Sequence, residues 1–187
     1  SVSGRYRLGG FCGINSVENG TANISDCYSN CKVIGFEGEI GGFCGVNYAH
    51  IGIVNISDCY STGDASGDNY VGGFCGLNYA DNGGTATMTD CYASGDATGN
   101  KIVGGFCGSN IADNGTAIIG RCYSNGITTG NFSFGAFCGS NIADIGTAKI
   151  FDCYATGDVS GNDYIGGFCG YNYTQKDTST AILERCY

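Results

Sequence analysis

The chain has 187 residues, of which 35 are glycine and none is proline or tryptophan, and its formal net charge is −9. This acidic balance, without any basic cluster, argues against a nucleic-acid partner. No run of 18 apolar residues occurs, so we predict no membrane span.

Two short phrases recur along the whole chain with a fixed period. The first, typified by Gly-Gly-Phe-Cys-Gly, places one cysteine every 31 or 32 residues, at Cys12, Cys44, Cys75, Cys107, Cys138 and Cys169. The second, Cys-Tyr, alternates with it at Cys27, Cys59, Cys91, Cys122, Cys153 and Cys186. Six copies of a unit of this length are typical of a solenoid or a propeller.

Between the two phrases, each period carries a short alternation of apolar residues that predicts a brief strand. In chain order these pairs are Ala22 and Ile24, Val54 and Ile56, Ala86 and Met88, Ala117 and Ile119, and Ala148 and Ile150. A helical solenoid is disfavoured because each glycine would cost a helix about 1 kcal/mol. A propeller blade needs roughly 40–45 residues. We therefore predict an all-β parallel β-helix of six coils, expected to be right-handed, forming one domain over 1–187.

Stacked coils place equivalent residues above one another about 4.8 Å apart, so each repeated residue becomes a ladder. We expect the asparagine ladder to lie where the chain turns, because asparagine tolerates left-handed backbone and can bond to its copies above and below. The predicted phenylalanine ladder is Phe11, Phe43, Phe74, Phe106, Phe137 and Phe168. The tyrosine ladder is Tyr28, Tyr60, Tyr92, Tyr123, Tyr154 and Tyr187, and the asparagine ladder is Asn15, Asn47, Asn78, Asn110, Asn141 and Asn172.

Thirteen cysteines indicate either disulfides or a metal site. Twelve of them recur one at a time, every 15 to 17 residues, and the chain has one histidine, His50. A zinc site would instead need close pairs of ligands. We expect disulfides, each contributing roughly 3 kcal/mol, and hence an oxidising compartment; no metal or cofactor is predicted. The expected pairs are Cys12–Cys27, Cys44–Cys59, Cys75–Cys91, Cys107–Cys122, Cys138–Cys153 and Cys169–Cys186. A register that begins with Cys27–Cys44 competes, and Cys31 is left as a surface thiol, either free or intermolecular.

The phrases "VGGFCGLN" and "DCYASGDATG" resemble the GLUG repeat of bacterial surface proteins in their glycines, their asparagine and the Cys-Tyr-x-x-Gly-Asp run. The resemblance covers all six periods from Leu8 to Tyr187 and departs at Phe-Cys, where the family more often has two aliphatic residues. It implies an extracellular or cell-surface β-rich repeat protein without an agreed enzymatic activity.

Three other functions have less support in the sequence than a structural one. No long loop or assembled catalytic set indicates an enzyme. Asp64, Asp96 and Asp158, with Asp68 and Asp163 nearby, could ligate calcium, but the first and fifth repeats lack this aspartate, at about Cys31 and at Gly126. The tyrosine ladder, with Tyr48, Tyr79 and Tyr173, could stack on glycans, which makes a surface adhesin or carbohydrate-binding segment of a longer protein the alternative.

The sequence favours a structural subunit of an extracellular filament that polymerises head to tail. The opening "SVSGRYRLGGFCG" matches "DVSGNDYIGGFCG", which starts at Asp158, after its first residue. Neither end resembles a polar capping repeat, so we expect another copy to continue the stack.

Overall fold

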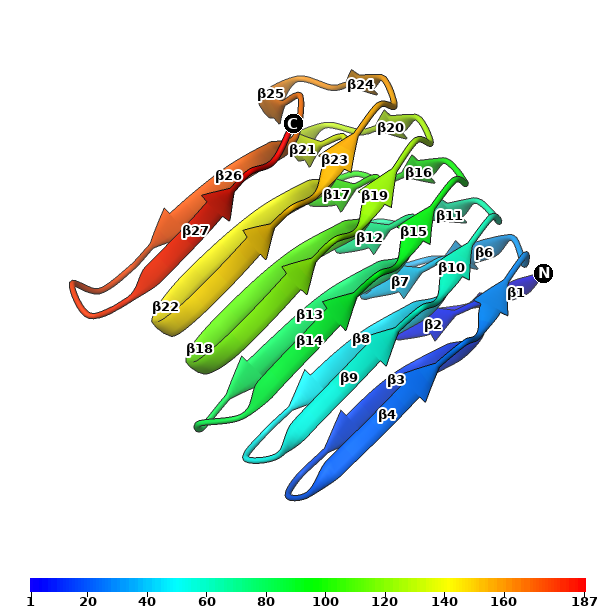
Figure 1. Cartoon of the computed structure of the whole chain (residues 1–187). Helices are drawn as coiled ribbons and strands as arrows, with labels where there is room; N and C mark the ends of the chain where they lie inside the picture. Colours follow the sequence, from blue (N-terminus) through cyan, green and yellow to red (C-terminus); the bar gives the residue numbers. More distant parts are fainter.

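A computed structural model describes residues 1–187 and shows six coils stacked along one axis, with no helix (Figure 1). Strands of neighbouring coils pair in parallel, as in β3 with β8 and β13 with β18. The two termini lie at opposite ends of the stack (Figure 1). The predicted all-β parallel solenoid is therefore confirmed, whereas the disulfide ladder is not formed.

Three sheets consist of very short strands; the first two take one strand from each coil, and the third takes strands from five coils. The first sheet contains β1 (Val2–Gly4), β6 (Val33–Gly35), β11 (Ala65–Ser66), β16 (Ala97–Thr98), β20 (Thr128–Thr129) and β24 (Val159–Ser160). The second contains β2 (Leu8–Gly9), β7 (Ile40–Gly41), β12 (Val71–Gly72), β17 (Val103–Gly104), β21 (Phe132–Gly135) and β25 (Asp163–Gly166). The third contains β5 (Tyr28–Ser29), β10 (Tyr60–Ser61), β15 (Tyr92–Ala93), β19 (Tyr123–Ser124) and β23 (Tyr154–Ala155).

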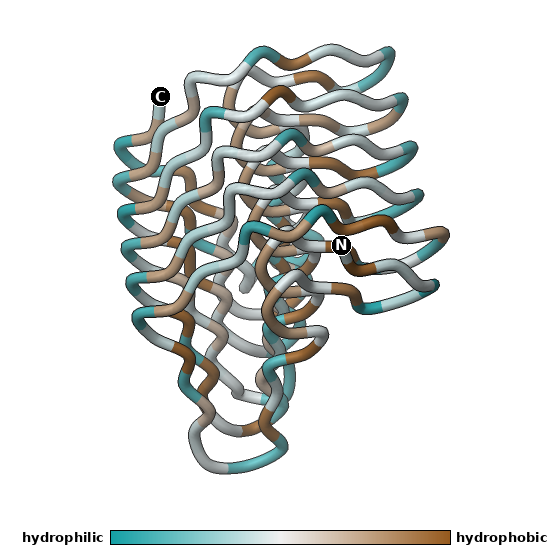
Figure 2. The backbone as a smooth tube through the Cα atoms, turned by 90° about the vertical axis from the view of Figure 1, so that its right-hand side faces the viewer, coloured by the Kyte–Doolittle hydropathy of each residue, from teal (hydrophilic) through white to brown (hydrophobic).

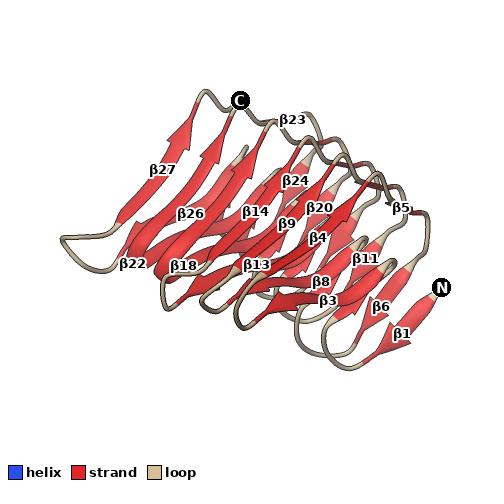
Figure 3. Ribbon diagram, turned by 60° about the horizontal axis from the view of Figure 1, so that its bottom comes forward, coloured by secondary structure: helices blue, strands red, loops and turns tan.

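The fourth sheet is the largest, and in each coil it forms a narrow finger whose two arms run out and back (Figures 1 and 3). The outgoing arms are β3 (Cys12–Val17), β8 (Cys44–Ala49), β13 (Cys75–Asp81) and β26 (Cys169–Thr174). The returning arms are β4 (Thr21–Ser25), β9 (Ile53–Ser57), β14 (Thr85–Thr89) and β27 (Thr180–Glu184). In the two remaining coils one strand spans both arms, β18 (Cys107–Gly120) and β22 (Cys138–Phe151).

The core is divided into three columns of side chains that run along the axis. Figure 2 shows the tapering cross-section that causes this division. Small residues such as Ala80 and Ala112 fill the thin finger, where the two arms lie close together. Both cysteine columns pack with the phenylalanines and with residues such as Met88 at the wide base of the finger. Val33, Ile40 and Phe134 belong to the third column, beside the first two sheets.

A left-handed corner precedes each Cys-Tyr phrase and explains why aspartate is so common there. The six residues at this corner have φ angles between 52° and 55° and are Asp26, Asp58, Asp90, Arg121, Asp152 and Arg185. Aspartate adopts this backbone region more readily than most side chains do. The corners of neighbouring coils also pair by charge: Arg121 lies 2.6 Å from Asp90, and Arg185 lies 2.5 Å from Asp152.

Glycine is required where coils come closest. A Cβ added at Gly95 would lie 2.2 Å from the carbonyl oxygen of Gly63 in the preceding coil. Gly63, Gly126 and Gly157 meet the preceding coil in the same way. This column of glycines therefore allows the backbones to approach to strand spacing.

Candidate functional site: stacked columns and coil faces

All thirteen cysteines are free thiols, so the predicted disulfides are wrong in either register. The absent pairs are Cys12–Cys27, Cys44–Cys59, Cys75–Cys91, Cys107–Cys122, Cys138–Cys153 and Cys169–Cys186, and the competing Cys27–Cys44 series is absent as well. The reason is geometric. Equivalent cysteines stack in register along the axis, as Cys75 does on Cys44 and Cys107, and each thiol of the two columns donates to a nearby carbonyl group.

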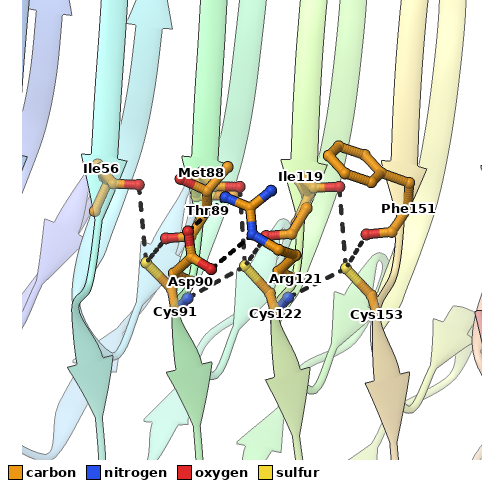
Figure 4. Close-up of polar contacts among 11 residues, drawn as sticks. Ile56, Met88, Thr89, Asp90, Cys91, Ile119, Arg121, Cys122, Phe151 and Cys153 are labelled. Carbon is orange, nitrogen blue, oxygen red and sulfur yellow. Dashed lines mark hydrogen bonds and ion pairs between the residues drawn. The ribbon is translucent and has the colours of Figure 1, made fainter.

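Each thiol of these two columns donates a hydrogen bond to a carbonyl two residues away. In the first column the acceptor follows the cysteine, as for Cys107 Sγ and Ser109 O at 3.2 Å. In the second column it precedes, as for Cys91 Sγ and Thr89 O at 3.0 Å. Figure 4 shows three members of the second column in a row, Cys91, Cys122 and Cys153, each also directed at a carbonyl of the preceding coil. Burial raises the pKa of Cys107 and of Cys122 well above the ordinary range of a thiol.

Cys31 lies in the glycine column and not in the aspartate column, which corrects the alignment expected from sequence. A Cβ added at Gly63 would lie 2.0 Å from the carbonyl oxygen of Cys31. Val33 pairs with Ala65, so Lys32 is the counterpart of Asp64. Cys31 is half-buried.

The asparagine column lies inside the outgoing arm of the finger and not at a turn, contrary to expectation. Asn47, Asn78, Asn110 and Asn141 are fully buried. Each side-chain nitrogen donates to the side-chain oxygen of the asparagine in the following coil, and the five bonds are all 2.8 Å long. The copies above and below therefore satisfy the buried amides, and the column has one polarity from the first coil to the last.

The phenylalanine and tyrosine columns are continuous ring stacks. Phenylalanine ring centroids lie 4.8–4.9 Å apart and those of the tyrosine column from Tyr28 to Tyr187 lie 4.9–5.6 Å apart. The interplanar angles do not exceed 12°. Each interior ring is therefore covered on both faces by its neighbours.

The turn aspartates bond to the backbone of the following coil. The carboxylate of Asp64 accepts the Asp96 amide at 3.2 Å, and that of Asp96 accepts the Ile127 amide at 2.8 Å. No group of three or more histidine, cysteine, aspartate or glutamate side chains is arranged to hold a metal ion. The structure thus assigns Asp64 and Asp96 to coil stacking.

The sequence analysis did not predict one polar cluster, which lies near the finger tips. His50 Nδ1 lies 2.9 Å from Asp81 Oδ1, and the Tyr48 hydroxyl donates to the same carboxylate at 3.2 Å. His50 and Asp81 are 31 residues apart. Because one repeat period separates them, the repeat alone could have predicted that they lie next to each other in neighbouring coils.

The two end faces of the stack expose residues that are buried in every interior coil. Phe11 is 49% exposed, whereas Phe43, Phe74, Phe106 and Phe137 are completely buried. At the opposite face Leu183 is 38% exposed, whereas its counterparts Ile56, Met88, Ile119 and Ile150 are completely buried. These faces also present unpaired edges of parallel sheet, which are surfaces that favour further strand pairing.

Comparison with known proteins gives one family match. Residues 67–98 match the model of the GLUG motif, which confirms the predicted resemblance in that repeat. No curated protein and no solved structure shows significant similarity to the chain. The motif and the solenoid together fit a repeat segment of a surface protein.

Proposed function

We propose that the chain is a structural subunit of an extracellular filament or surface fibre, in which copies stack head to tail through their end faces. The observation that carries this proposal is the exposure of Phe11 at one face and Leu183 at the other. Both belong to columns that are buried wherever a further coil covers them. A further copy would bury this apolar surface and pair the open strand edges.

The polarity of the columns supports a head-to-tail contact over a head-to-head one. At the first coil Asn15 leaves its side-chain oxygen free for a donor, and each later asparagine donates toward the next coil. The corner column begins with Asp26 and ends with Arg185. Stacking Asp26 of one copy after Arg185 of another would place opposite charges on neighbouring coils, in the order that Arg121 and Asp152 have within the chain.

The surface location proposed here rests on the GLUG resemblance alone, because free thiols remove the argument from disulfides. The structure contains no helix that could span a membrane.

The alternative of glycan binding by the long tyrosine column has less support. A sugar ring binds an aromatic residue through the ring face, and in this column the faces cover one another.

Two face variants test the proposal in solution. Phe11→Glu places a charge on the first face and Leu183→Glu on the last, while Thr98→Glu, on an exposed side strand, is the control. Wild type and the control should form fibres by electron microscopy, and each face variant alone should remain monomeric by light scattering with an unchanged β-sheet circular dichroism spectrum.

Mixing the two face variants gives the sharpest outcome. Each retains one intact face, and these faces are opposite, so a head-to-tail contact allows dimers and nothing larger. A wild type that stays monomeric at high concentration would refute the filament. Dimers of Leu183→Glu alone would refute the head-to-tail arrangement.

A further inference from the structure

A groove of about 510 Å³ crosses the first three coils beside the outgoing arm of the finger. Outward-facing residues of β3, β8 and β13 line it, including Ser16, Tyr48, Leu77 and Tyr79. Arg7 and Glu39, which precede β2 and β7, complete the lining. This volume is in the usual range of small-molecule sites, roughly 300–1,000 Å³, and the lining combines apolar surface with a few polar groups.

A column of tyrosine rings lines the groove, and it is interrupted in the first coil. Ser16, Tyr48 and Tyr79 occupy equivalent positions in coils one to three. The rings of Tyr48 and Tyr79 stack 5.4 Å apart at an angle of 16°. The other face of Tyr48 is turned toward the first coil, where the column holds only a serine. A ring-sized space therefore remains over Ser16, bounded on one side by an aromatic face.

Hydrogen bonds from their hydroxyl groups hold the two tyrosine side chains in place. The Tyr48 hydroxyl donates to Asp81 at 3.2 Å, and the Tyr79 hydroxyl donates to Asp113 at 3.3 Å. Burial, together with the nearby carboxylates, raises the pKa of Tyr79 to about 12. Both rings are thus fixed, and the open face of Tyr48 is prepared to receive a ligand before binding.

The polar groups of the groove offer donors and an acceptor side by side. Arg7 Nε lies 3.9 Å from Glu39 Oε2, and the exposed Ser16 hydroxyl lies in the same groove. Adjacent sugar hydroxyls need this combination, because each hydroxyl both donates and accepts. One positive and one negative group balance each other here, so a neutral ligand fits better than an anion on a chain of net charge −9.

We propose that this groove binds a neutral carbohydrate, with one pyranose ring stacked on the open face of Tyr48 above Ser16 and neighbouring hydroxyls bonded to Arg7 and Glu39. The site lies within one chain and does not depend on filament formation. It differs from the long tyrosine column, whose ring faces are covered.

The decisive variant completes the ring column. Ser16→Tyr copies the residue found in the next two coils and fills the proposed sugar position without removing any contact. Tyr48→Ala removes the platform, and Tyr92→Ala in the long tyrosine column is the matched control. Neutral oligomers of glucose, N-acetylglucosamine, galactose, mannose and xylose are the probes, titrated by calorimetry with saturation-transfer NMR of the sugar protons.

At least one probe should bind saturably to wild type and to Tyr92→Ala with the same affinity. Ser16→Tyr and Tyr48→Ala should each weaken that binding at least about tenfold, and Ser16→Tyr should melt no lower than wild type. The proposal is overturned if no probe binds, if Ser16→Tyr binds as wild type does, or if Tyr92→Ala abolishes binding.

Discussion

At the level of single residues, cysteine in this fold acts as a small apolar side chain with a weak donor. Cys107 is completely buried beside phenylalanine rings, and its thiol donates to Ser109 O at 3.2 Å. Serine at such a position would carry a stronger polar group into an apolar core, and valine would lose the donor. The repeated cysteines therefore satisfy packing and hydrogen bonding without any covalent bond.

This role predicts a two-class labelling pattern. The eight buried thiols, at Cys44, Cys59, Cys75, Cys91, Cys107, Cys122, Cys138 and Cys153, should resist iodoacetamide in the native protein. Cys12, Cys27, Cys31, Cys169 and Cys186 are partly exposed and should react first. Burial raises the pKa of Cys107 and Cys122, so these two thiols should remain slow to label when the pH is raised toward 9.

Mass spectrometry counts the alkylated cysteines. Denaturation without a reducing agent should allow all thirteen thiols to be alkylated. A protein with only one reactive cysteine after denaturation would restore the disulfide ladder that the structure contradicts.

The buried asparagines are the second residue-level determinant. Asn110 accepts from Asn78 at 2.8 Å and donates to Asn141 at 2.8 Å and to Ala117 O at 3.2 Å. Asn110→Asp removes both donors and buries a carboxylate, so it should destabilise the fold by about 3 kcal/mol or more. Thermal unfolding measures this loss. The control is Asn55→Asp in the exposed Asn55–Asn23 pair, and an equal fall in melting temperature for both variants would argue against the burial effect.

At the level of elements, the sequence allowed the strands to be predicted but not the directions of their side chains. The repeat period and the Ala22–Ile24 type of alternation were enough for parallel coils. Asn78 was expected at a turn because asparagine tolerates left-handed backbone. It lies in a strand because its copies in the neighbouring coils supply the partners that a lone strand residue lacks.

The same limit explains the error about disulfides and the unassembled polar cluster. Spacing places Cys75 and Cys91 half a coil apart, but it does not show that each thiol already bonds to carbonyls beside it. His50 and Asp81 are separated by one period, so their contact was within reach of the repeat argument. The space above Ser16 could not be predicted from the repeat, because it depends on the ring orientation of Tyr48.

The closeness of the coils gives a prediction for the glycine column. Alanine at Gly95 would bring its Cβ to 2.2 Å from Gly63 O, so Gly95→Ala should lower stability by roughly 1–3 kcal/mol, the typical cost of overpacking. Gly167→Ala is the control, because a Cβ there meets no atom within 4 Å. Urea unfolding of both variants tests this. Equal midpoints would show that the coils can separate at little cost.

At the level of the whole molecule, every column continues along one axis, so each end face is a template for the next coil. The column that contains Ser16, Tyr48 and Tyr79 continues through Ile111 and Ile142 to Tyr173 in the last coil. In a head-to-tail stack, Tyr173 of one copy would therefore precede Ser16 of the next. The space above Ser16 would then lie between two tyrosine rings that are two coil steps, or roughly 10 Å, apart.

This arrangement predicts that carbohydrate binding and polymerisation reinforce each other. A sugar ring above Ser16 would contact Tyr48 of its own chain and Tyr173 of the neighbouring copy, so fibres should bind the probe about tenfold more tightly than monomeric Leu183→Glu does. Since coupling between two equilibria is reciprocal, the same probe should promote fibre growth by an equal factor. Light scattering during titration of protein with and without the probe measures this shift as a lower critical concentration. Tyr173→Ala should still polymerise but lose the shift, and equal probe affinity for fibres and for Leu183→Glu monomers would show that the neighbouring copy contributes nothing to the site.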